Sequence, residues 1–292
     1  MTVRKAIFPA AGLGTRFLPV TKAQPKEMLP LVDKPTIQYG VEEAIASGIE
    51  QVIMVTGGGK RAIVDHFDRS IELEHYLEER GKEDLLKILA DVDELSNRAV
   101  ITYIQQKEPR GLGDAVWTAR SLVEGEACAV LLADDVIVCP ENPCLKQLID
   151  AHARTGATVL AVRRVPKSQV SRYGIIATAG SRDGLHEVTD LIEKPNAADA
   201  PSDLAALGRY VILPAVFEEL GNVGPGAGKE IQLVDAIKRT IGRHPVVALE
   251  FEGDYYDTGT VAGYLRANVT MAMKREELRD ELEPLLRELL QG

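Results

Sequence analysis

The chain has 292 residues, of which 45% are hydrophobic and 27% are charged, so it can bury a large core beneath a solvated surface. This composition excludes extended disorder, and the length suits one large α/β domain with an appendage. The net charge of −10 argues against nucleic acid as the main partner, although a locally basic cleft can still bind a small anion.

The hydrophobic runs and the cysteines indicate the environment of the protein. Runs such as residues 129–133 are too short to cross a bilayer, and the first residues lack the apolar segment of an export signal. The three cysteines, Cys128, Cys139 and Cys144, form no CxxC pair, which favours reduced thiols over a metal site. We therefore expect a cytoplasmic protein with no membrane partner.

Short apolar strands alternate with helical patterns through the first half of the chain. The strand patterns cover residues 3–10, 51–56, 100–106 and 127–134, and the helical patterns cover 41–48, 60–67 and 113–122. This alternation predicts an α/β fold with a doubly wound, mostly parallel, Rossmann-like sheet. Such a sheet binds ligands beyond the carboxyl ends of its strands.

Two helical segments lie outside this alternation. Residues 68–98 are charged with an apolar stripe at helical spacing, which predicts an inserted helical hairpin that turns at Gly81. Further strands follow from residue 157 to 213, some of them antiparallel, and residues 260–291 have the pattern of one long helix. We expect a single domain over residues 1–258 and a C-terminal helical segment over 259–292, packed on its own domain or on a sister subunit.

The first motif that indicates chemistry is AAGLGTRFLPVTKAQPKEMLP, at residues 10–30. Gly12 and Gly14 follow a predicted strand, and glycines there allow the backbone to approach a phosphate closely. Phe17 stands where a dinucleotide fingerprint needs a third glycine, and no GK[ST] follows. The motif therefore predicts neither a dinucleotide site nor a P-loop.

Two cations in the same motif, Arg16 and Lys26, suit a polyphosphate. A helix terminus favours an anion by about 0.3–1 kcal/mol, whereas a cation at ~4 Å contributes about 4 kcal/mol at an effective dielectric near 20. Backbone amides can orient phosphates, but cations and a metal ion must neutralise them. Ordinary surface charge is the alternative for both residues.

Two carboxylates follow predicted strands. Asp134 ends the apolar run at 127–134, a position that suits Mg²⁺, which takes one or two carboxylates together with substrate phosphates and water. Its neighbour Asp135 is expected to point the other way. Asp257, in YYDTG, fits a metal ligand and a helix N-cap almost equally well. A strand-end cap is also the alternative for Asp134.

Two further pairs can recognise parts of a substrate. Glu193 and Lys194 end a predicted strand and can bind a sugar hydroxyl and a sugar phosphate, although a surface ion pair is the simpler interpretation. Gln106 can read the imide edge of a pyrimidine, and Gly111 allows the base to lie on the backbone. No Ser/His/Asp or Cys/His arrangement stands out, and phosphoryl transfer needs none.

Residues 10–44 strongly resemble the opening of bacterial UTP–glucose-1-phosphate uridylyltransferases. GxGTR followed by PK is shared by sugar nucleotidyltransferases, and PKEMLP with IQY is closer to the uridylyl than to the thymidylyl branch. Further matches make the resemblance span nearly the whole chain, at residues 59–68, 106–116, 193–195, 208–212 and 230–237.

The resemblance implies a nucleotidyltransferase that transfers UMP from UTP to α-D-glucose 1-phosphate, giving UDP-glucose and pyrophosphate with the help of Mg²⁺. It implies an in-line displacement in which the sugar phosphate is already ionised and needs no general base. The family is usually homo-oligomeric, which implies a dimer or tetramer with the terminal helix at an interface. The implied catalytic residues are Arg16, Lys26, Asp134 and Lys194; the substrate-binding residues are Ala10, Ala11, Gly12, Gly14, Thr15, Gln106, Gly111, Gly174, Glu193 and Asp257; the metal ligands are Asp134 and Asp257.

Three positions depart from the pattern of the family. Gly58 stands where an arginine is expected, Asp114 where histidine is common, and Tyr255 where a basic residue is more usual. Two alternatives stay open: the same chemistry with dTTP or another sugar phosphate, and a non-catalytic sensor that binds UDP-glucose without turnover. A nicotinamide dehydrogenase is disfavoured by Phe17.

Overall fold

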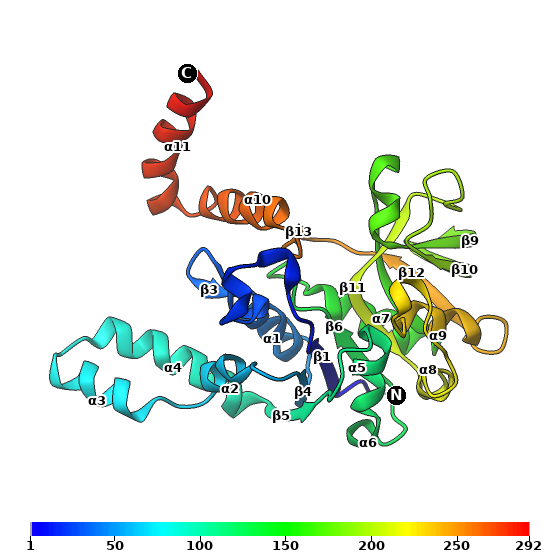
Figure 1. Ribbon diagram of the computed structural model, residues 1–292, viewed down its shortest axis with the longest axis horizontal. Helices are drawn as coiled ribbons and strands as arrows, with labels where there is room; N and C mark the ends of the chain where they lie inside the picture. The colour runs from blue at the N-terminus through cyan, green and yellow to red at the C-terminus, as the bar shows by residue number, and fades with distance from the viewer. Residues whose placement is uncertain (1, 292) are drawn as a thin grey trace.

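The computed structural model describes residues 2–291 and is built around a nine-stranded sheet in the order β5-β4-β1-β6-β11-β8-β12-β10-β9 (Figure 1). The first four strands pair in parallel and coincide with the four runs predicted in the first half of the chain. They are β1 (Lys5–Ala10), β4 (Gln51–Thr56), β5 (Val100–Gln105) and β6 (Cys128–Leu131). Between them in the chain lie α1 (Thr36–Ala46), α2 (Arg61–Phe67) and α5 (Leu112–Thr118).

The prediction of a mostly parallel sheet is wrong, because the second half is mixed. β11 (Leu204–Ile212) runs antiparallel to β6 and to β8 (Thr158–Arg164), and β12 (Val246–Glu250) is parallel to β8. β9 (Gly174–Arg182) and β10 (Leu185–Glu193) are antiparallel. Only Asp183 and Gly184 connect these two strands, with φ of 53° and 74°, and a two-residue turn of this kind reverses the chain into a hairpin.

Helices cover both faces of the sheet, and the central strands alternate between two apolar layers. In β1, Ala6 and Phe8 belong to one buried cluster and Ile7 belongs to the other. The first cluster includes α1 and α7 (Cys144–Thr155); the second includes α5, α8 (Pro214–Leu220) and α9 (Leu233–Thr240). The central strands are therefore packed on both faces, and they hold the loops at their carboxyl ends in fixed positions.

The segment predicted as an inserted helical hairpin, residues 68–98, contains two helices joined by a short turn. These are α3 (Ile71–Glu79) and α4 (Glu83–Arg98), with Gly81 in the turn at a φ of 61°. Figure 1 shows the hairpin extending from the side of the sheet that carries β5. The structure thus agrees with the position of the insertion between β4 and β5.

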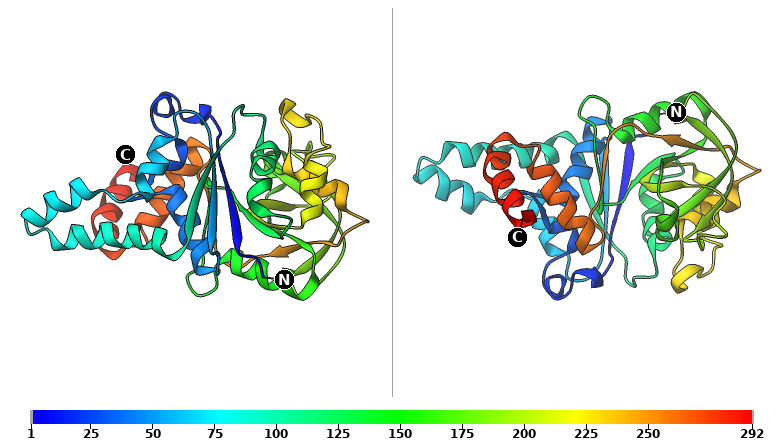
Figure 2. Two further views of the ribbon diagram at one scale, coloured as in Figure 1. Left: turned by 90° about the horizontal axis from the view of Figure 1, so that it is seen from below. Right: turned by 90° about the horizontal axis from the view of Figure 1, so that it is seen from above.

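The prediction of one long terminal helix is wrong. The chain forms α10 (Val261–Ala272) and α11 (Glu276–Gln291), with a break between them. Lys274 pairs with Asp254 and Arg275 pairs with Asp33, each at 2.5 Å, so long-range ion pairs hold the break against the domain. Figure 2 shows both helices on the same side of the sheet as the hairpin. Within residues 2–291, no helix has the length and apolar character needed to cross a membrane.

A buried ion pair ties the sheet to its helices below the ligand-binding edge. Arg209 of β11 is 1% exposed and donates from Nε and Nη2 to Glu43 Oε2 of α1, at 2.9 and 2.8 Å. Glu43 Oε1 accepts from the backbone N–H of Leu145 at 2.9 Å, and Arg209 Nη1 donates to the carbonyl of Leu132 at 3.0 Å. Because Leu132 lies two residues before Asp134, this network also supports the loop that carries Asp134.

Glu43→Gln is expected to lower the free energy of unfolding by about 3–5 kcal/mol, because it leaves the buried Arg209 charge without its counter-ion. Urea denaturation followed by circular dichroism measures the change. The matched control is Glu50→Gln, whose side chain pairs with Arg4 at 3.8 Å and is 67% exposed. That control is expected to cost less than about 1 kcal/mol. Equal losses in the two variants would show that burial of the Glu43 pair is unimportant.

Candidate active site

Two cavities lie at the carboxyl ends of the parallel strands and share one wall. The first has a volume of about 410 Å³ and the second about 570 Å³. Leu112, Leu132, Asp134 and Glu230 line both cavities, so the two form a continuous cleft with Asp134 at the junction. A cleft of this size at this edge of an α/β sheet is the usual place for a ligand.

The predicted site residues divide between the two cavities. The first is lined by Ala11, Gly12, Gly14, Thr15, Lys26, Gln106, Gly111 and Asp134. The second is lined by Arg16, Asp134, Gly174, Glu193, Lys194 and Asp257. Ala10 lies behind the cavity wall, where its side chain is part of the core at the end of β1.

Gly14 allows the glycine turn to fold back on the segment that carries Lys26. Its φ of 65° is in the left-handed region, and its carbonyl accepts a hydrogen bond from Thr21 Oγ1 at 2.8 Å. A β-carbon at this position would lie 3.1 Å from Thr21 Cγ2 and 3.4 Å from Lys26 Cβ. Only glycine combines this backbone conformation with so close a contact.

An ion pair between Lys26 and Asp134 joins two distant parts of the chain in the cleft. Lys26 Nζ lies 2.5 Å from Asp134 Oδ2, although the two residues are 108 positions apart in the chain. Burial disfavours the charged form of both groups, but their mutual attraction outweighs it, so the pKa of Lys26 is raised and the pKa of Asp134 is lowered. Both groups are therefore charged at neutral pH.

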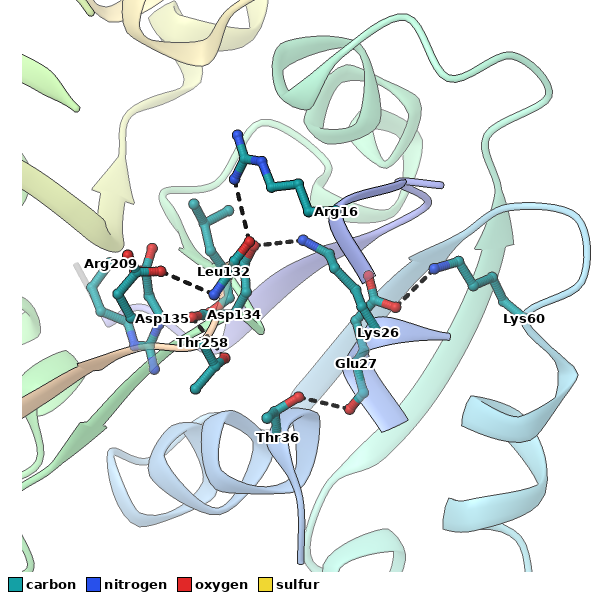
Figure 3. Close-up of polar contacts among 12 residues, drawn as sticks. Arg16, Lys26, Glu27, Thr36, Lys60, Leu132, Asp134, Asp135, Arg209 and Thr258 are labelled. Atoms are coloured by element: carbon teal, nitrogen blue, oxygen red, sulfur yellow. Dashed lines mark hydrogen bonds and ion pairs between the residues drawn. The ribbon is translucent and has the colours of Figure 1, made fainter. Parts of the chain in front are cut away.

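Arg16 approaches the same carboxylate from a second direction (Figure 3). Arg16 Nη1 donates to the carbonyl of Gly259 at 3.3 Å, and its charge helps to lower the pKa of Asp134. It lines the second cavity, whereas Lys26 lines the first. The two predicted cations thus converge on Asp134 from opposite sides of the junction.

Asp257 lies beside Asp134 because β13 (Asp254–Asp257) pairs with β7 (Asp135–Val138). The Thr258 N–H and hydroxyl both donate to the carbonyl of Asp134, at 2.8 and 2.9 Å. A β-carbon at Gly259 would lie 3.0 Å from Asp134 Oδ2 and 3.3 Å from Asp257 Oδ1, so these two oxygens face the same small space. The N-cap of α10 is Thr260, which means that Asp257 is not the helix cap.

Asp135 has different partners from Asp134 but also lines the second cavity. Tyr255 donates its hydroxyl proton to Asp135 Oδ1 at 2.5 Å, and Gly208, with a φ of 41°, leaves room for the Asp135 side chain. Burial and the neighbouring Asp134 charge raise the pKa of Asp135 to about 7. Tyr255, a departure from the pattern of the family, therefore has a defined polar role here.

The amide of Gln106 is held in one orientation. Its Nε2 donates to Asp114 Oδ2 at 2.6 Å and to the carbonyl of Gly111 at 3.3 Å. Because a carboxylate accepts only, the amide nitrogen must face Asp114, which leaves the amide oxygen as an acceptor for a ligand. Arg110 pairs with Asp114 Oδ1 at 2.6 Å. The departure at Asp114 is thus the anchor of Gln106.

Gly111 serves mainly to pack its loop. Its φ is 116°, and a β-carbon there would lie 2.7 Å from the carbonyl oxygen of Ile231 and 2.9 Å from its nitrogen. The Ile231 N–H donates to the carbonyl of Arg110 at 2.8 Å. This close contact of two backbones requires glycine and shapes the wall of the first cavity.

Glu193 and Lys194 lie at the far end of the second cavity. Lys194 Nζ is 3.0 Å from Glu193 Oε1; the Glu193 side chain is 12% exposed and that of Lys194 is 46% exposed, so the carboxylate is largely buried and the ammonium group is accessible. Glu193 is opposite Gly174 in the β9–β10 register, and a β-carbon at Gly174 would lie 3.2 Å from Glu193 Oε2. Lys194 has a φ of 46°, an unusual conformation for a non-glycine residue, and such conformations cluster at functional sites.

Three charged residues near the cleft were not predicted as site residues from the sequence: Glu27, Lys60 and Arg172. Lys60 Nζ donates to Glu27 Oε2 at 2.7 Å, both side chains are buried, and Glu27 Oε1 has no hydrogen-bond partner among the described residues. Thr36 Oγ1 donates to the Glu27 carbonyl at 2.9 Å, so the turn that carries Lys26 is held from two sides. The only signal in the sequence was the charge of Glu27 next to Lys26.

Comparison with known proteins adds independent evidence. A family model described as nucleotidyl transferase matches residues 5–274. The chain is 52% identical over 288 residues to the UTP–glucose-1-phosphate uridylyltransferase of Bacillus subtilis (strain 168), covering 99% of this chain and 97% of that protein. It is 50% identical over 287 residues to UTP–glucose-1-phosphate uridylyltransferase 2 of Staphylococcus saprophyticus, covering 98% of each.

Two solved structures are similar over nearly the whole chain. UDP-glucose pyrophosphorylase complexed with UDP-glucose has a TM-score of 0.86 and 42% identity, covering 94% of this chain and 100% of that one. The UTP-bound enzyme from Acinetobacter baumannii has a TM-score of 0.89 and 37% identity, covering 98% of this chain and 99% of that one.

Proposed function

The chain belongs to the nucleotidyl transferase family and, within it, to the bacterial UTP–glucose-1-phosphate uridylyltransferases, and we propose that it carries out their reaction. It transfers UMP from UTP to α-D-glucose 1-phosphate, giving UDP-glucose and pyrophosphate. The observation that carries the assignment is the meeting of two cavities at Asp134, with a cation from each side. Such an arrangement suits two anionic substrates that react at the junction.

We propose that the first cavity binds the nucleotide and the second binds glucose 1-phosphate. The glycine turn and Lys26 line the first cavity and suit a triphosphate, while Gln106 lies farther along its wall and suits a base. Lys194, Glu193 and Gly174 line the second cavity and suit a phosphorylated sugar. Support comes from the similar structures, whose names include UTP and UDP-glucose.

The orientation of Gln106 supports recognition of a pyrimidine imide. Its free amide oxygen can accept the N3–H of uracil, whereas cytosine has no proton at N3. Thymine has the same imide, so this contact selects against CTP but does not separate UTP from dTTP. Selection of the uridylyl substrate rests on the similarity to the uridylyltransferases.

Asp134 and Asp257 fit Mg²⁺, the metal ion that we propose for this reaction. Their facing oxygens border the small space beside Gly259 that a β-carbon would fill. Within residues 2–291, no group of three or more His, Cys, Asp or Glu side chains is arranged to hold a metal ion. Mg²⁺ prefers a site with one or two carboxylates, because substrate phosphates and water complete its coordination. When bound, it neutralises charge on the phosphates.

The side chains divide the remaining work of the displacement. An oxygen of the sugar phosphate forms a bond to the α-phosphorus of UTP, and the bond from that phosphorus to the pyrophosphate oxygen breaks. The attacking oxygen is already ionised, so no proton has to be removed. Lys194 orients the sugar phosphate, and Lys26 offsets the charge that develops on pyrophosphate. Arg16, which lines the second cavity beside Asp134, offsets negative charge at the junction where the two substrates meet.

We also propose that the C-terminal helical segment, residues 259–292, forms an interface in a homo-oligomer. α11 has no buried residues, and Leu285, Leu289 and Leu290 are 49%, 68% and 88% exposed. An amphipathic helix without a buried residue is typical of a surface that packs on another subunit. Residues 1–258 then supply most of the cleft, and Gly259 and Thr260 at the start of the segment complete the lining of the second cavity.

Lys26→Ala and Asp134→Ala are each expected to lower kcat/KM by about 10²–10³-fold, the usual effect of removing one group that stabilises charge in the transition state. Pyrophosphate release from UTP and glucose 1-phosphate measures the loss. Lys22→Ala, an exposed lysine in the same loop, is the control and should keep normal turnover. Near-normal turnover in both site variants would refute the proposed mechanism.

Asp114→Ala is expected to raise KM for UTP by about tenfold, because it releases the Gln106 amide from its fixed orientation. The KM for glucose 1-phosphate should stay the same. Arg110→Ala is the matched control, since it removes the other partner of Asp114 and keeps the Gln106 contact. Pyrophosphate-release kinetics with UTP, dTTP and CTP side by side give the comparison. An equal effect of both variants would contradict the role of Gln106.

Gly259→Ala is expected to weaken Mg²⁺ binding by about tenfold, because its methyl group fills the space between two carboxylate oxygens. Isothermal titration with Mg²⁺ in the absence of nucleotide measures this directly. Gly180→Ala is the control, since a β-carbon there meets nothing within 4 Å. Unchanged Mg²⁺ affinity in Gly259→Ala would argue against a metal ion at this place.

A further inference from the structure

The side chain of Arg172 forms an ion pair with Asp257 and lies on the side of Asp257 that faces the second cavity. Its Nη2 donates to Asp257 Oδ2, while Asp257 Oδ1 accepts from the Gly259 N–H at 2.9 Å. Arg172 ends a short 3-10 helix, Lys167–Arg172, and lines the second cavity together with Lys194. The guanidinium is therefore bound to one of the two carboxylates that fit Mg²⁺.

The backbone places Arg172 next to the expected position of the sugar phosphate. The Lys194 N–H donates to the carbonyl of Tyr173 at 3.0 Å. Arg172 is the residue before Tyr173, so this backbone hydrogen bond brings Arg172 and Lys194 close together. The Arg172 guanidinium also lies 5.6 Å from the centre of the Tyr173 ring. A cation in this position can reach the second cavity without any change in the backbone.

The two carboxylates are held in matching ways. Lys26 neutralises Asp134 from the first cavity, and Arg172 neutralises Asp257 from the second. Without these cations, two like charges that face the space beside Gly259 would repel each other. The Arg172 side chain is 43% exposed and that of Lys26 is 24% exposed, so Arg172 is the freer of the two to change partners.

We propose that Arg172 exchanges partners during the reaction: it neutralises Asp257 in the free enzyme and moves to the sugar phosphate when a divalent cation binds the two carboxylates. This inference rests on the proposed function. Arg172 binds Asp257 Oδ2, and a divalent cation in the space beside Gly259 would bind Oδ1 of the same carboxylate. Each cation therefore draws on the single negative charge of Asp257 and weakens the binding of the other. Once released, a guanidinium binds a phosphate well, because its parallel N–H groups match two phosphate oxygens. Arg172 thereby couples metal binding to capture of the sugar phosphate.

A permanent structural pair would behave differently. If Arg172 only stabilised the loop, its removal would weaken every ligand of the second cavity or none of them. Partner exchange instead predicts effects of opposite sign on two ligands. Mg²⁺ binding should improve, because its competitor is gone, while binding of the sugar phosphate should weaken.

The test measures binding without turnover, in the absence of pyrophosphate. Isothermal titration of Arg172→Ala with Mg²⁺ alone should show an affinity about fivefold to tenfold higher than that of the unaltered protein. With Mg²⁺ present, UDP-glucose should bind about tenfold more weakly, whereas UMP, which lacks the sugar phosphate, should bind equally well. Arg172→Lys keeps a cation and should restore part of both effects. Arg163→Ala is the control and should change neither, because Arg163 is exposed and lines a neighbouring cavity rather than the second cavity.

The outcomes separate this inference from the proposed function. If the unaltered protein does not bind UDP-glucose, the proposed function is wrong, and this inference fails with it. If it binds UDP-glucose but Arg172→Ala leaves Mg²⁺ affinity unchanged or weaker, partner exchange alone is overturned. Unchanged UDP-glucose affinity in Arg172→Ala would overturn it as well. Thermal melting of each variant confirms that the altered proteins are folded.

Discussion

The ion pair between Lys26 and Asp134 is the interaction on which the whole cleft depends. It joins the turn after β1 to the loop after β6 and forms part of the wall between the two cavities. Because the partners are oppositely charged and partly buried, each keeps the other ionised. A protein with a net charge of −10 can therefore present a fixed cation to a polyphosphate, close to a carboxylate that suits a metal ion.

Two buried ion pairs hold the two chain segments that carry this interaction. Lys60 holds Glu27, the neighbour of Lys26, and Arg209 binds the Leu132 carbonyl two residues before Asp134. Buried pairs of this kind add little net stability, because desolvation offsets most of the attraction. These pairs instead fix the geometry: each holds the backbone in place on its side of the Lys26–Asp134 pair.

The local features of the fold could be predicted from the sequence, whereas the features set by distant partners could not. The strands around β1 and β6, the glycine turn and Asp134 follow from apolar runs and from residues that end them. The direction of β9 and β10 depends on the short turn at Asp183, and the break after α10 depends on ion pairs to Asp33 and Asp254. Neither signal appears in a pattern of apolar spacing. Arg172 was missed for the same reason, since its partner is 85 residues away.

Under the proposed function, recognition of the base is separate from the chemistry of transfer. Near Asp134, charges act on one another over several ångströms, and a pair of unit charges at 4 Å interacts by about 4 kcal/mol at an effective dielectric near 20. Nucleotide phosphates, metal ion and sugar phosphate therefore cannot bind there independently of one another. Gln106 instead uses a neutral amide, whose hydrogen bond acts only over short range. A change of base preference at Gln106 can thus leave the charge balance at Asp134 intact, while any change of charge in one cavity must be felt in the other.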